Sequence, residues 1–582
     1  MARESEGRLG VLGILSKKGG IIVQTKGRVW VIFGLLALLV LLCACAKAET
    51  VSTPTPMGTM VLPTATPLGA EMKPIPGGSL RLYWTSDLPY WDPNMGAGGQ
   101  AAANMIHAFV LNHNYGPKYP EWNFDISSDG LADSWEMSPD GLTYTFHLKK
   151  GVKWQDKPPV NGRELVAEDV KWSVWNIIKT PAAPRRTQFE EAVQSIDCPD
   201  KYTVVFHLKE PRASFLLYMA NPYVEILPHE SMEEFGDFNS PKAAVGAGPF
   251  ILEEYTPAVS IVFKKNPTYY RANEGLPYLD GVRFIIIPDA STSLAAFRAA
   301  NIDIRGIARV DLASVKKTNP DIYCYEAGVS ASALQLAMRT DKPPFNDVRV
   351  RRALSMALDR QAVIDTFHFG YGIDQQGPIH AASKWYLKDQ GECAKYGKYN
   401  PDEAKRLLAE AGYPNGFETT LEGTPSWGAE WGEYYIDALA DIGIKARIRM
   451  HDLGAWYQLC RAKYEALGWL YGWGGATLDP DMWVEGLYAP WSPLDFSAVN
   501  DPKLNEMILA QRAALNPEKR QEILNEIQRY DACQRYYVQW PLAYSVTCQQ
   551  SWVRNYMSHA ANYSTGRIYE IVWLDQTSPS RK

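Results

Sequence analysis

The chain lacks the short motifs that mark several enzyme classes. It has no G-x-x-x-x-G-K-[ST] phosphate loop, no G-x-S-x-G nucleophile elbow and no H-E-x-x-H zinc helix. No two of its nine histidines are spaced i, i+4, and no cysteines form a C-x-x-C pair. We therefore predict no catalytic residue, no cofactor and no metal site from local motifs.

The chain also lacks an excess of basic residues. Lys and Arg number 59 against 65 Asp and Glu, so the net charge is −6. The first 28 residues hold six basic and two acidic residues, which leaves −10 on the remainder. A nucleic-acid-binding protein is expected to carry a basic surplus, so no nucleic-acid partner is predicted. With 46% hydrophobic and 21% charged residues, the 582-residue chain has an ordinary globular composition with several lobes.

Only one long apolar run is present, at residues 29–46, and it follows the basic N-terminus. This order predicts an export signal. An uncleaved membrane anchor is the alternative, because 18 apolar residues reach the lower limit of a membrane span. Either interpretation places the rest of the chain outside the cytoplasm.

The tetrapeptide Leu42-Cys43-Ala44-Cys45 resembles the bacterial lipoprotein signal. The resemblance implies a signal peptide at 1–45 and a lipid on Cys45, the mature N-terminus. Residues 46–76 are rich in Thr and Pro, which favours an extended linker without a core. The predicted location is the outer face of the cell membrane, by the lipid anchor, or the periplasmic space.

Six cysteines follow the signal, and an exported protein permits disulfides between them. Their spacing leaves several connectivities open, as well as free buried thiols. They are Cys198, Cys324, Cys393, Cys460, Cys533 and Cys548.

Hydrophobic periodicity predicts a strand-rich first part. Residues 79–84, 142–148 and 202–208 alternate apolar and polar side chains, as half-buried strands do. We expect the last two to be antiparallel strands of one sheet, with an amphipathic helix at 167–175 between them.

The later part has a mixed α/β pattern. Residues 282–288 are almost continuously apolar, which predicts a strand buried on both faces. Helices are expected at 291–300, along one stripe at 348–366, from Asn400 to Gly412, and at 516–529. A helix end should pass through Gly443 into a strand that ends at residue 450.

Nine blocks in order resemble the bacterial solute-binding proteins of ABC importers, family 5, which take peptides, nickel or oligosaccharides. They include L-A-D-S-W at 131–135, Y-T-F-H-L at 144–148, G-A-G-P-F at 246–250 and P-F-N-D-V-R at 344–349. The resemblance spans about 77–560 and implies an α/β, periplasmic-binding-protein-like fold. Such a fold has two lobes, a hinge, and an extra domain inserted in lobe one.

On this pattern, lobe one comprises 77–111, 229–325 and 540–582, the inserted domain is 112–228, and lobe two is 326–539. The resemblance implies that solute closes the lobes about the hinge, and that a separate permease with its ATPase subunits receives it.

The segment 469–481 resembles the cleft motif GWxxDxxxPxxF of peptide-binding relatives. Trp473 matches its Trp, and Gly474 and Gly475 follow. The position of the motif's Asp, which pairs with a peptide α-ammonium, falls on Ala476, whereas Asp479 lies three residues on. The missing acid weakens the case for a free peptide N-terminus.

Further cleft residues are predicted from the same resemblance. Trp456 and Arg461 match a second cleft-lining stretch. Aromatic residues of the opening strand and the loop after it are also predicted to line the cleft: Tyr83, Trp84, Tyr90 and Trp91. Asp87 and Asp92 are expected to cap loops instead of contacting ligand.

We expect the ligand to be an oligopeptide, with an oligosaccharide as the alternative because aromatic faces suit sugar rings. Two further functions stay open: a glycoside hydrolase, which needs two carboxylates across the scissile bond, and a non-transport receptor. Some relatives bind nickel chelates, so a metal site from distant histidines also stays open.

Overall fold

The computed structural model describes residues 72–581 apart from 96–99, 117–124, 184, 330–333, 382, 426–428, 472–478, 493 and 558–564. These described residues belong to one unit, residues 62–582. The predicted signal peptide, its Cys45 and most of the linker lie outside them. Among the described residues, no helix combines the length and apolar character needed to span a membrane.

The first sheet has the order β1-β10-β9-β8, with β1 and β10 parallel and the other neighbours antiparallel. Its strands are β1 (Ser79–Trp84), β10 (Gly281–Ile286), β9 (Ser260–Lys265) and β8 (Phe250–Thr256). The strand expected at 79–84 is confirmed. The expectation that β10 is buried on both faces is wrong, because Arg283 is exposed and Ile285 is half-buried. One face of β10 therefore reaches solvent.

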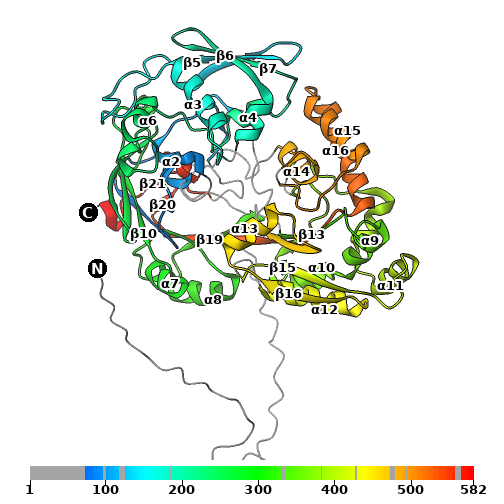
Figure 1. The fold of residues 1–582 in the computed structure, drawn as a ribbon. Helices are drawn as coiled ribbons and strands as arrows, with labels where there is room; N and C mark the ends of the chain where they lie inside the picture. The colour runs from blue at the N-terminus through cyan, green and yellow to red at the C-terminus, as the bar shows by residue number, and fades with distance from the viewer. Residues whose placement is uncertain are drawn as a thin grey trace, which may run out of the picture. The chain divides into compact units, whose positions relative to one another are not determined.

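The second sheet is antiparallel, with the order β4-β5-β7-β6. It comprises β4 (Ala132–Met137), β5 (Thr143–Leu148), β7 (Thr203–Leu208) and β6 (Val193–Asp200). Strands β5 and β7 pair directly and bury every second residue, as the alternation predicted. Helices α3 (Ala167–Lys179) and α4 (Arg186–Ala192) lie beside this sheet (Figure 1).

The third sheet has the order β16-β15-β17-β13-β18, in which β16, β15 and β17 are parallel. Its strands are β16 (Lys445–Met450), β15 (Glu418–Gly423), β17 (Leu467–Tyr471), β13 (Leu334–Met338) and β18 (Tyr537–Gln539). The accompanying helices are α9 (Val348–Ala357), α10 (Arg360–Phe367), α11 (Pro401–Glu410) and α12 (Ala429–Asp441) (Figure 1).

The single helical stripe expected at 348–366 is two helices, α9 and α10. Leu358 has extended backbone, and the Asp359 side chain accepts a hydrogen bond from the backbone N–H of Ala362. This N-cap starts a new helix inside a continuous apolar pattern. By contrast, Asn400 caps α11 as expected. The helix expected at 516–529 is α16 (Pro517–Gln534), and Asn516 is its N-cap.

A fourth sheet, β11-β19-β12, links the first and third sheets. It contains β11 (Ile304–Gly306), β19 (Leu542–Gln549) and β12 (Tyr323–Val329), and β14 (Gly372–Ile373) also pairs with β19. The disulfide Cys324–Cys548 joins directly opposite residues of β12 and β19.

The remaining main elements are α2 (Gln100–Ile106), β2 (Asn112–His113), β3 (Ile126–Ser127), α5 (Phe215–Met219), α6 (His229–Phe235), α7 (Ala290–Arg298), α8 (Arg309–Thr318), α13 (Leu453–Arg461), α14 (Asp481–Tyr488), α15 (Pro502–Ala513), β20 (Val553–Arg554), α17 (Thr565–Ile568) and β21 (Trp573–Leu574). Short 3-10 turns are η1 (Pro93–Met95), η2 (Pro241–Ala243), η3 (Ala272–Glu274), η4 (Gly391–Gly397) and η7 (Pro579–Arg581). The helix expected at 291–300 corresponds to α7.

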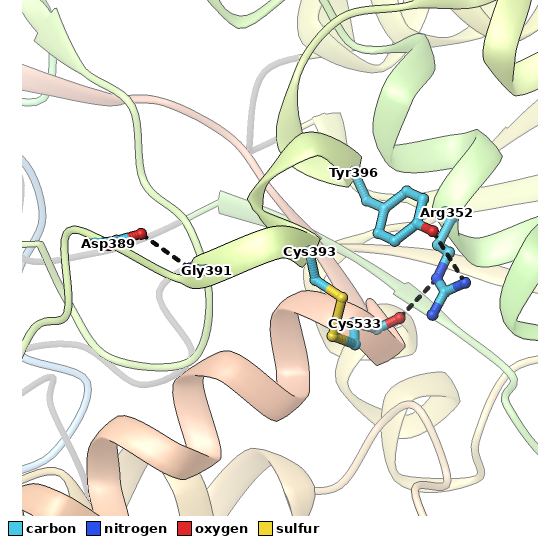
Figure 2. Close-up of a disulfide and its surroundings, with 6 residues drawn as sticks. All are labelled: Arg352, Asp389, Gly391, Cys393, Tyr396 and Cys533. Carbon is cyan, nitrogen blue, oxygen red and sulfur yellow. Dashed lines mark hydrogen bonds between the residues drawn. A yellow bond between two sulfur atoms is a disulfide. The ribbon is translucent and has the colours of Figure 1, made fainter.

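A second disulfide, Cys393–Cys533, ties η4 to the last turn of α16 (Figure 2). Arg352 of α9 joins the same place: its Nε donates to the carbonyl of Cys533 at 2.8 Å and its Nη1 to the Tyr396 hydroxyl at 3.3 Å. Three elements distant in sequence therefore meet at this disulfide. Cys198 and Cys460 are free thiols.

Replacing Cys393 and Cys533 together by serine should lower the free energy of unfolding by about 2–4 kcal/mol, because the bridge closes a loop of 140 residues in the unfolded chain. Urea unfolding followed by circular dichroism measures the change. Cys198→Ser, which removes a half-buried free thiol, is the control. A double variant that unfolds at the wild-type urea midpoint would contradict this assignment.

Candidate functional site

The carboxyl ends of β15, β16 and β17 meet at one edge of the third sheet. In open α/β sheets, ligands bind outside the carboxyl ends of the parallel strands. Here the strands lead into Thr424, His451 and residues 472–478. Thr424 is 1% exposed, and its hydroxyl has no hydrogen-bond partner among the described residues.

A buried carboxylate lies at the same edge. Glu422 is 4% exposed and accepts a hydrogen bond from His451 Nε2 at 2.7 Å. Arg449 Nη1 approaches the other oxygen of Glu422 at 3.4 Å. The edge thus presents an acid that is held by the histidine directly after the neighbouring strand β16.

Trp456, a predicted cleft residue, is fully buried. Its ring is nearly parallel to those of His451 and Tyr464, with ring centroids 6.4 Å and 6.3 Å away. It therefore supports the Glu422–His451 pair from inside the core. The Arg461 side chain lies outside the described part of the structure, although its backbone ends α13.

Asp479 is engaged by a partner within the protein. Both of its oxygens accept hydrogen bonds from Arg520, at 2.5 and 2.8 Å, and the two side chains are 2% and 5% exposed. Trp473, Gly474, Gly475 and Ala476 precede it in the segment 472–478, outside the described residues, so their role stays a prediction.

Of the predicted aromatic residues, Tyr83 and Trp84 lie at the carboxyl end of β1, and Tyr90 and Trp91 lie in the loop after it. Trp84 is half-buried and stacks on Phe284 with ring centroids 4.1 Å apart. Tyr83 and Tyr90 are also half-buried, whereas Trp91 is 8% exposed and packs edge-on against Tyr255. Tyr83, Trp84 and Tyr90 therefore expose part of their surface, and Trp91 belongs to the core.

Asp87 and Asp92 cap loops, as expected. Asp87 accepts hydrogen bonds from the Tyr255 hydroxyl at 2.9 Å and from the backbone N–H of Ala258 at 2.7 Å. Asp92 accepts one from the backbone N–H of Asn94 at 2.8 Å.

A buried polar network joins α5, and the segment before it, to α14 and α15. Asp481, 1% exposed, accepts hydrogen bonds from Ser214 Oγ at 2.9 Å and from the Tyr218 hydroxyl at 2.8 Å. Arg512 donates to Glu485 at 2.8 Å and to Glu210 at 2.5 Å. We call these six residues the Asp481 network. It connects chain segments more than 260 residues apart.

The pKa values of the two α14 carboxylates shift in opposite directions. Burial alone would raise the pKa of Asp481, but Arg520, Arg212 and the hydroxyl of Tyr218 lower it below its usual value. Burial and then the charge of Asp481 raise the pKa of Glu485 to about 7. Glu485 is therefore the group of this network that changes charge near neutral pH.

The sequence profile of one protein family, the bacterial extracellular solute-binding proteins, family 5, matches residues 128–493, which is more than half of the chain. The chain belongs to this family. This agrees with the family predicted from the sequence blocks. The chain, called the family 5 protein below, is also similar to individual relatives. It is 29% identical to heme-binding protein A of Haemophilus influenzae over 68% of this chain and 76% of that one. It is 30% identical to di/tripeptide-binding protein 1 of Pseudomonas aeruginosa over 69% and 77%.

Solved structures share the two-lobed α/β fold of the family 5 protein. DppA from Helicobacter pylori in complex with the peptide STSA superposes with a TM-score of 0.74 and 25% identity, covering 86% of this chain and 99% of that chain. AgaA from A. tumefaciens R10 in complex with agropinic acid gives a TM-score of 0.71 at 26% identity, covering 86% and 99%. The predicted fold class is therefore confirmed.

Glu422, His451 and the Asp481 network were not identified from the sequence. The strand expected to end at residue 450 places His451 directly after a parallel strand, so this signal was present in the pattern. The network had no local signal, because Ser214 and Tyr218 lie in a different part of the chain from Asp481.

Glu485 should make the stability of the family 5 protein depend on pH. Its pKa rises from 4.5 to about 7 in the folded state, so the folded state keeps a proton that the unfolded state releases. The free energy of unfolding should therefore fall, by about 1–3 kcal/mol, as pH rises from about 4.5 through about 7. In Glu485→Gln this component should be absent.

Chemical denaturation of both proteins between pH 4.5 and 8 measures the difference, a range chosen from the two pKa values of Glu485. Glu506→Gln, at an exposed position of α15, is the matched control and should follow the wild type. Parallel pH profiles for wild type and Glu485→Gln would contradict the assignment.

Proposed function

We propose that this protein is the extracytoplasmic solute-binding component of an ABC importer, and that it captures an oligopeptide by hinge closure and delivers it to a permease. The observation that carries the proposal is the paired connection between its sheets. Strands β12 and β19 pair in the fourth sheet. Strand β13, which follows β12 in the chain, and strand β18, which precedes β19, pair in the third sheet.

The strands support the predicted lobe ranges. The first sheet draws its strands from 77–111 and 229–325, the second from 112–228, and the third from 326–539. The ladder between β12 and β19 is irregular between Glu326 and Val329, where the predicted first lobe ends. We propose that the bending occurs here, beyond the cross-link Cys324–Cys548.

The Asp481 network is proposed to hold the closed state. Its residues Glu210, Ser214 and Tyr218 belong to the predicted inserted domain, and Asp481, Glu485 and Arg512 to the predicted second lobe. These contacts exist only while the two parts are together. They would therefore lower the free energy of the closed form relative to an open one.

An oligopeptide is the proposed ligand. Support comes from the di/tripeptide-binding relative and from the peptide complex of the Helicobacter pylori protein. Because Ala476 stands where the family's acid is expected and Asp479 is paired with Arg520, we propose that the peptide's α-ammonium is not the main recognised group.

An oligosaccharide is the second candidate, since Ala476 and the half-buried Tyr83, Trp84 and Tyr90 favour a neutral solute with ring faces. In either case the proposed protein binds and releases its solute without catalysis. The matched family consists of solute-binding proteins, which supports this view over a glycoside hydrolase.

A thermal-shift screen of the purified protein tests the ligand class. Bound ligand stabilises the folded state by about 2.7 kcal/mol at 100 times its dissociation constant. We expect oligopeptides to raise the melting midpoint, with N-acetylated and free peptides acting alike. Shifts from oligosaccharides alone would overturn the peptide assignment, and steady product release from an oligosaccharide would overturn the binding role itself.

We further propose that Cys45 carries a lipid and is the mature N-terminus. Mass spectrometry of the N-terminal peptide from the native host should find a diacylglyceryl-modified Cys45. Cys45→Ser should leave the signal uncleaved at this position. A mature chain that begins at Met1 would contradict the proposal.

A further inference from the structure

The Asp481 network belongs to a wider interface between the predicted inserted domain and the predicted second lobe. The backbone N–H of Ala213 donates a hydrogen bond to the carbonyl of Arg512 at 2.9 Å. Lys384 Nζ lies 3.5 Å from Asp125 Oδ1, and both side chains are exposed. Each of these contacts joins a residue of the inserted domain to a residue of lobe two. The charges on the two sides therefore face one another only while the two parts are together.

The charged groups that surround Glu485 at this interface include more acids than bases. Arg212 Nη1 and Arg512 Nη1 lie 4.0 and 2.8 Å from Glu485. The same two guanidinium groups also face Glu191, at 3.7 and 4.0 Å, and Glu210, at 3.4 and 2.5 Å. Four carboxylates thus surround two guanidinium groups: Glu191, Glu210, Asp481, Glu485, Arg212 and Arg512.

The centre of this cluster is shielded from water. Asp481 and Arg212 are each 1% exposed, and the side chain of Glu485 is 13% exposed. When all six groups are ionised, four negative charges against two positive charges leave −2 at the interface. Asp481 and Glu485 lie one turn apart on α14, so their charges repel each other where little solvent screens them. One bound proton would relieve this repulsion.

Glu485 is the carboxylate best placed to hold that proton. Three side chains donate hydrogen bonds to Asp481 and stabilise its ionised form: Ser214, Tyr218 and Gln511. Glu485 Oε1 accepts hydrogen bonds from Arg512 and from Trp491 Nε1, at 2.8 and 2.9 Å. Its Oε2 lies 4.0 Å from Arg212 Nη1, beyond hydrogen-bond distance, and can therefore carry a proton. Burial, followed by the charge of Asp481, raises the pKa of Glu485 to about 7.

Two further ionisable groups reach the same region. Burial and the charge of Asp481 raise the pKa of the Tyr218 hydroxyl well above its ordinary value of 10.0, so this group stays neutral. Arg520 helps to lower the pKa of Asp481, but it is matched by Asp479 through two hydrogen bonds, so this pair adds no net charge. The excess of acid therefore remains with the six charged groups.

We propose that closure of the inserted domain onto lobe two takes up one proton, which Glu485 holds, so that the protein binds solute more tightly at mildly acidic than at alkaline pH. The inference rests on the proposed capture of solute by closure and adds a dependence on protons to it. The Asp481 network is the coupling element, because it joins the two parts and includes Glu485.

The direction of the pH effect follows from the two environments of Glu485. In an open form, water reaches the side chain, and its pKa falls back towards the ordinary value of 4.5. Between pH 4.5 and about 7, the closed form holds the proton and the open form does not. Solute affinity should therefore fall as pH rises through this range and level off above it.

Isothermal titration calorimetry in buffers of different ionisation enthalpy counts the protons taken up on binding. The probe is an N-acetylated peptide without histidine that raises the melting midpoint, because its own charge is constant near neutral pH. At about pH 6, the wild type should take up about one proton per peptide bound. Its dissociation constant should rise on the order of tenfold from about pH 5.5 to about pH 7.5.

Glu485→Gln removes the titrating group and keeps the size of the side chain. It should take up no proton, and at about pH 7.5 it should bind the peptide at least as tightly as the wild type does at about pH 5.5. Glu506→Gln makes the same charge change at an exposed position of α15 and should behave as the wild type. A purely structural role of Glu485 would alter the melting midpoint and leave the proton count unchanged. No proton uptake by the wild type, or an equal uptake by Glu485→Gln, would overturn the proposal.

The coupling also has a test without solute. If no peptide binds, the peptide assignment fails, and small-angle X-ray scattering of the ligand-free protein then decides the coupling. The wild type should have a smaller radius of gyration at about pH 5.5 than at about pH 7.5, with the molecular mass unchanged. Glu485→Gln should have the smaller radius at both pH values. Equal radii of the wild type at the two pH values would overturn the coupling.

Discussion

The antiparallel pairing of β12 with β19 is the constraint on which the rest of the structure depends. The chain leaves the region of the first sheet through β12 and returns to it through β19. Cys324 and Cys548 face each other in this ladder and are covalently joined, so the register of the two strands is fixed at that end. Beyond the irregularity at Glu326, β13 and β18 carry both connections into the third sheet. Any relative motion of the two regions must pass through these connections.

Buried charge organises the regions on either side. Asp479 with Arg520, and Arg271 with Glu570, are paired and multiply hydrogen-bonded, which is the condition for keeping charges out of water. The Asp481 network extends the same principle between distant segments, and it includes a carboxylate that titrates near neutral pH. Arg567 differs, because its Nε and Nη1 have no hydrogen-bond partner in the part of the chain that the structure describes.

The sequence was sufficient for local structure and family. Alternating side chains predicted β5 and β7, the cap at Asn400 predicted the start of α11, and a helix was expected where α16 lies. It failed where tertiary contacts decide: one apolar stripe could not reveal that Asp359 starts a second helix, and β10 did not bury both faces. The Asp479–Arg520 pair and the burial of Trp456 in a core with Ala337 and Tyr537 follow from long-range packing, which residue spacing does not encode.

The central claim is that solute closes two lobes about the β12–β19 connection. Small-angle X-ray scattering of the purified protein, with and without a peptide that raises its melting midpoint, tests this most directly. A smaller radius of gyration in the presence of the peptide, with no change in molecular mass, is the predicted result. An identical scattering profile with saturating peptide would contradict the claim.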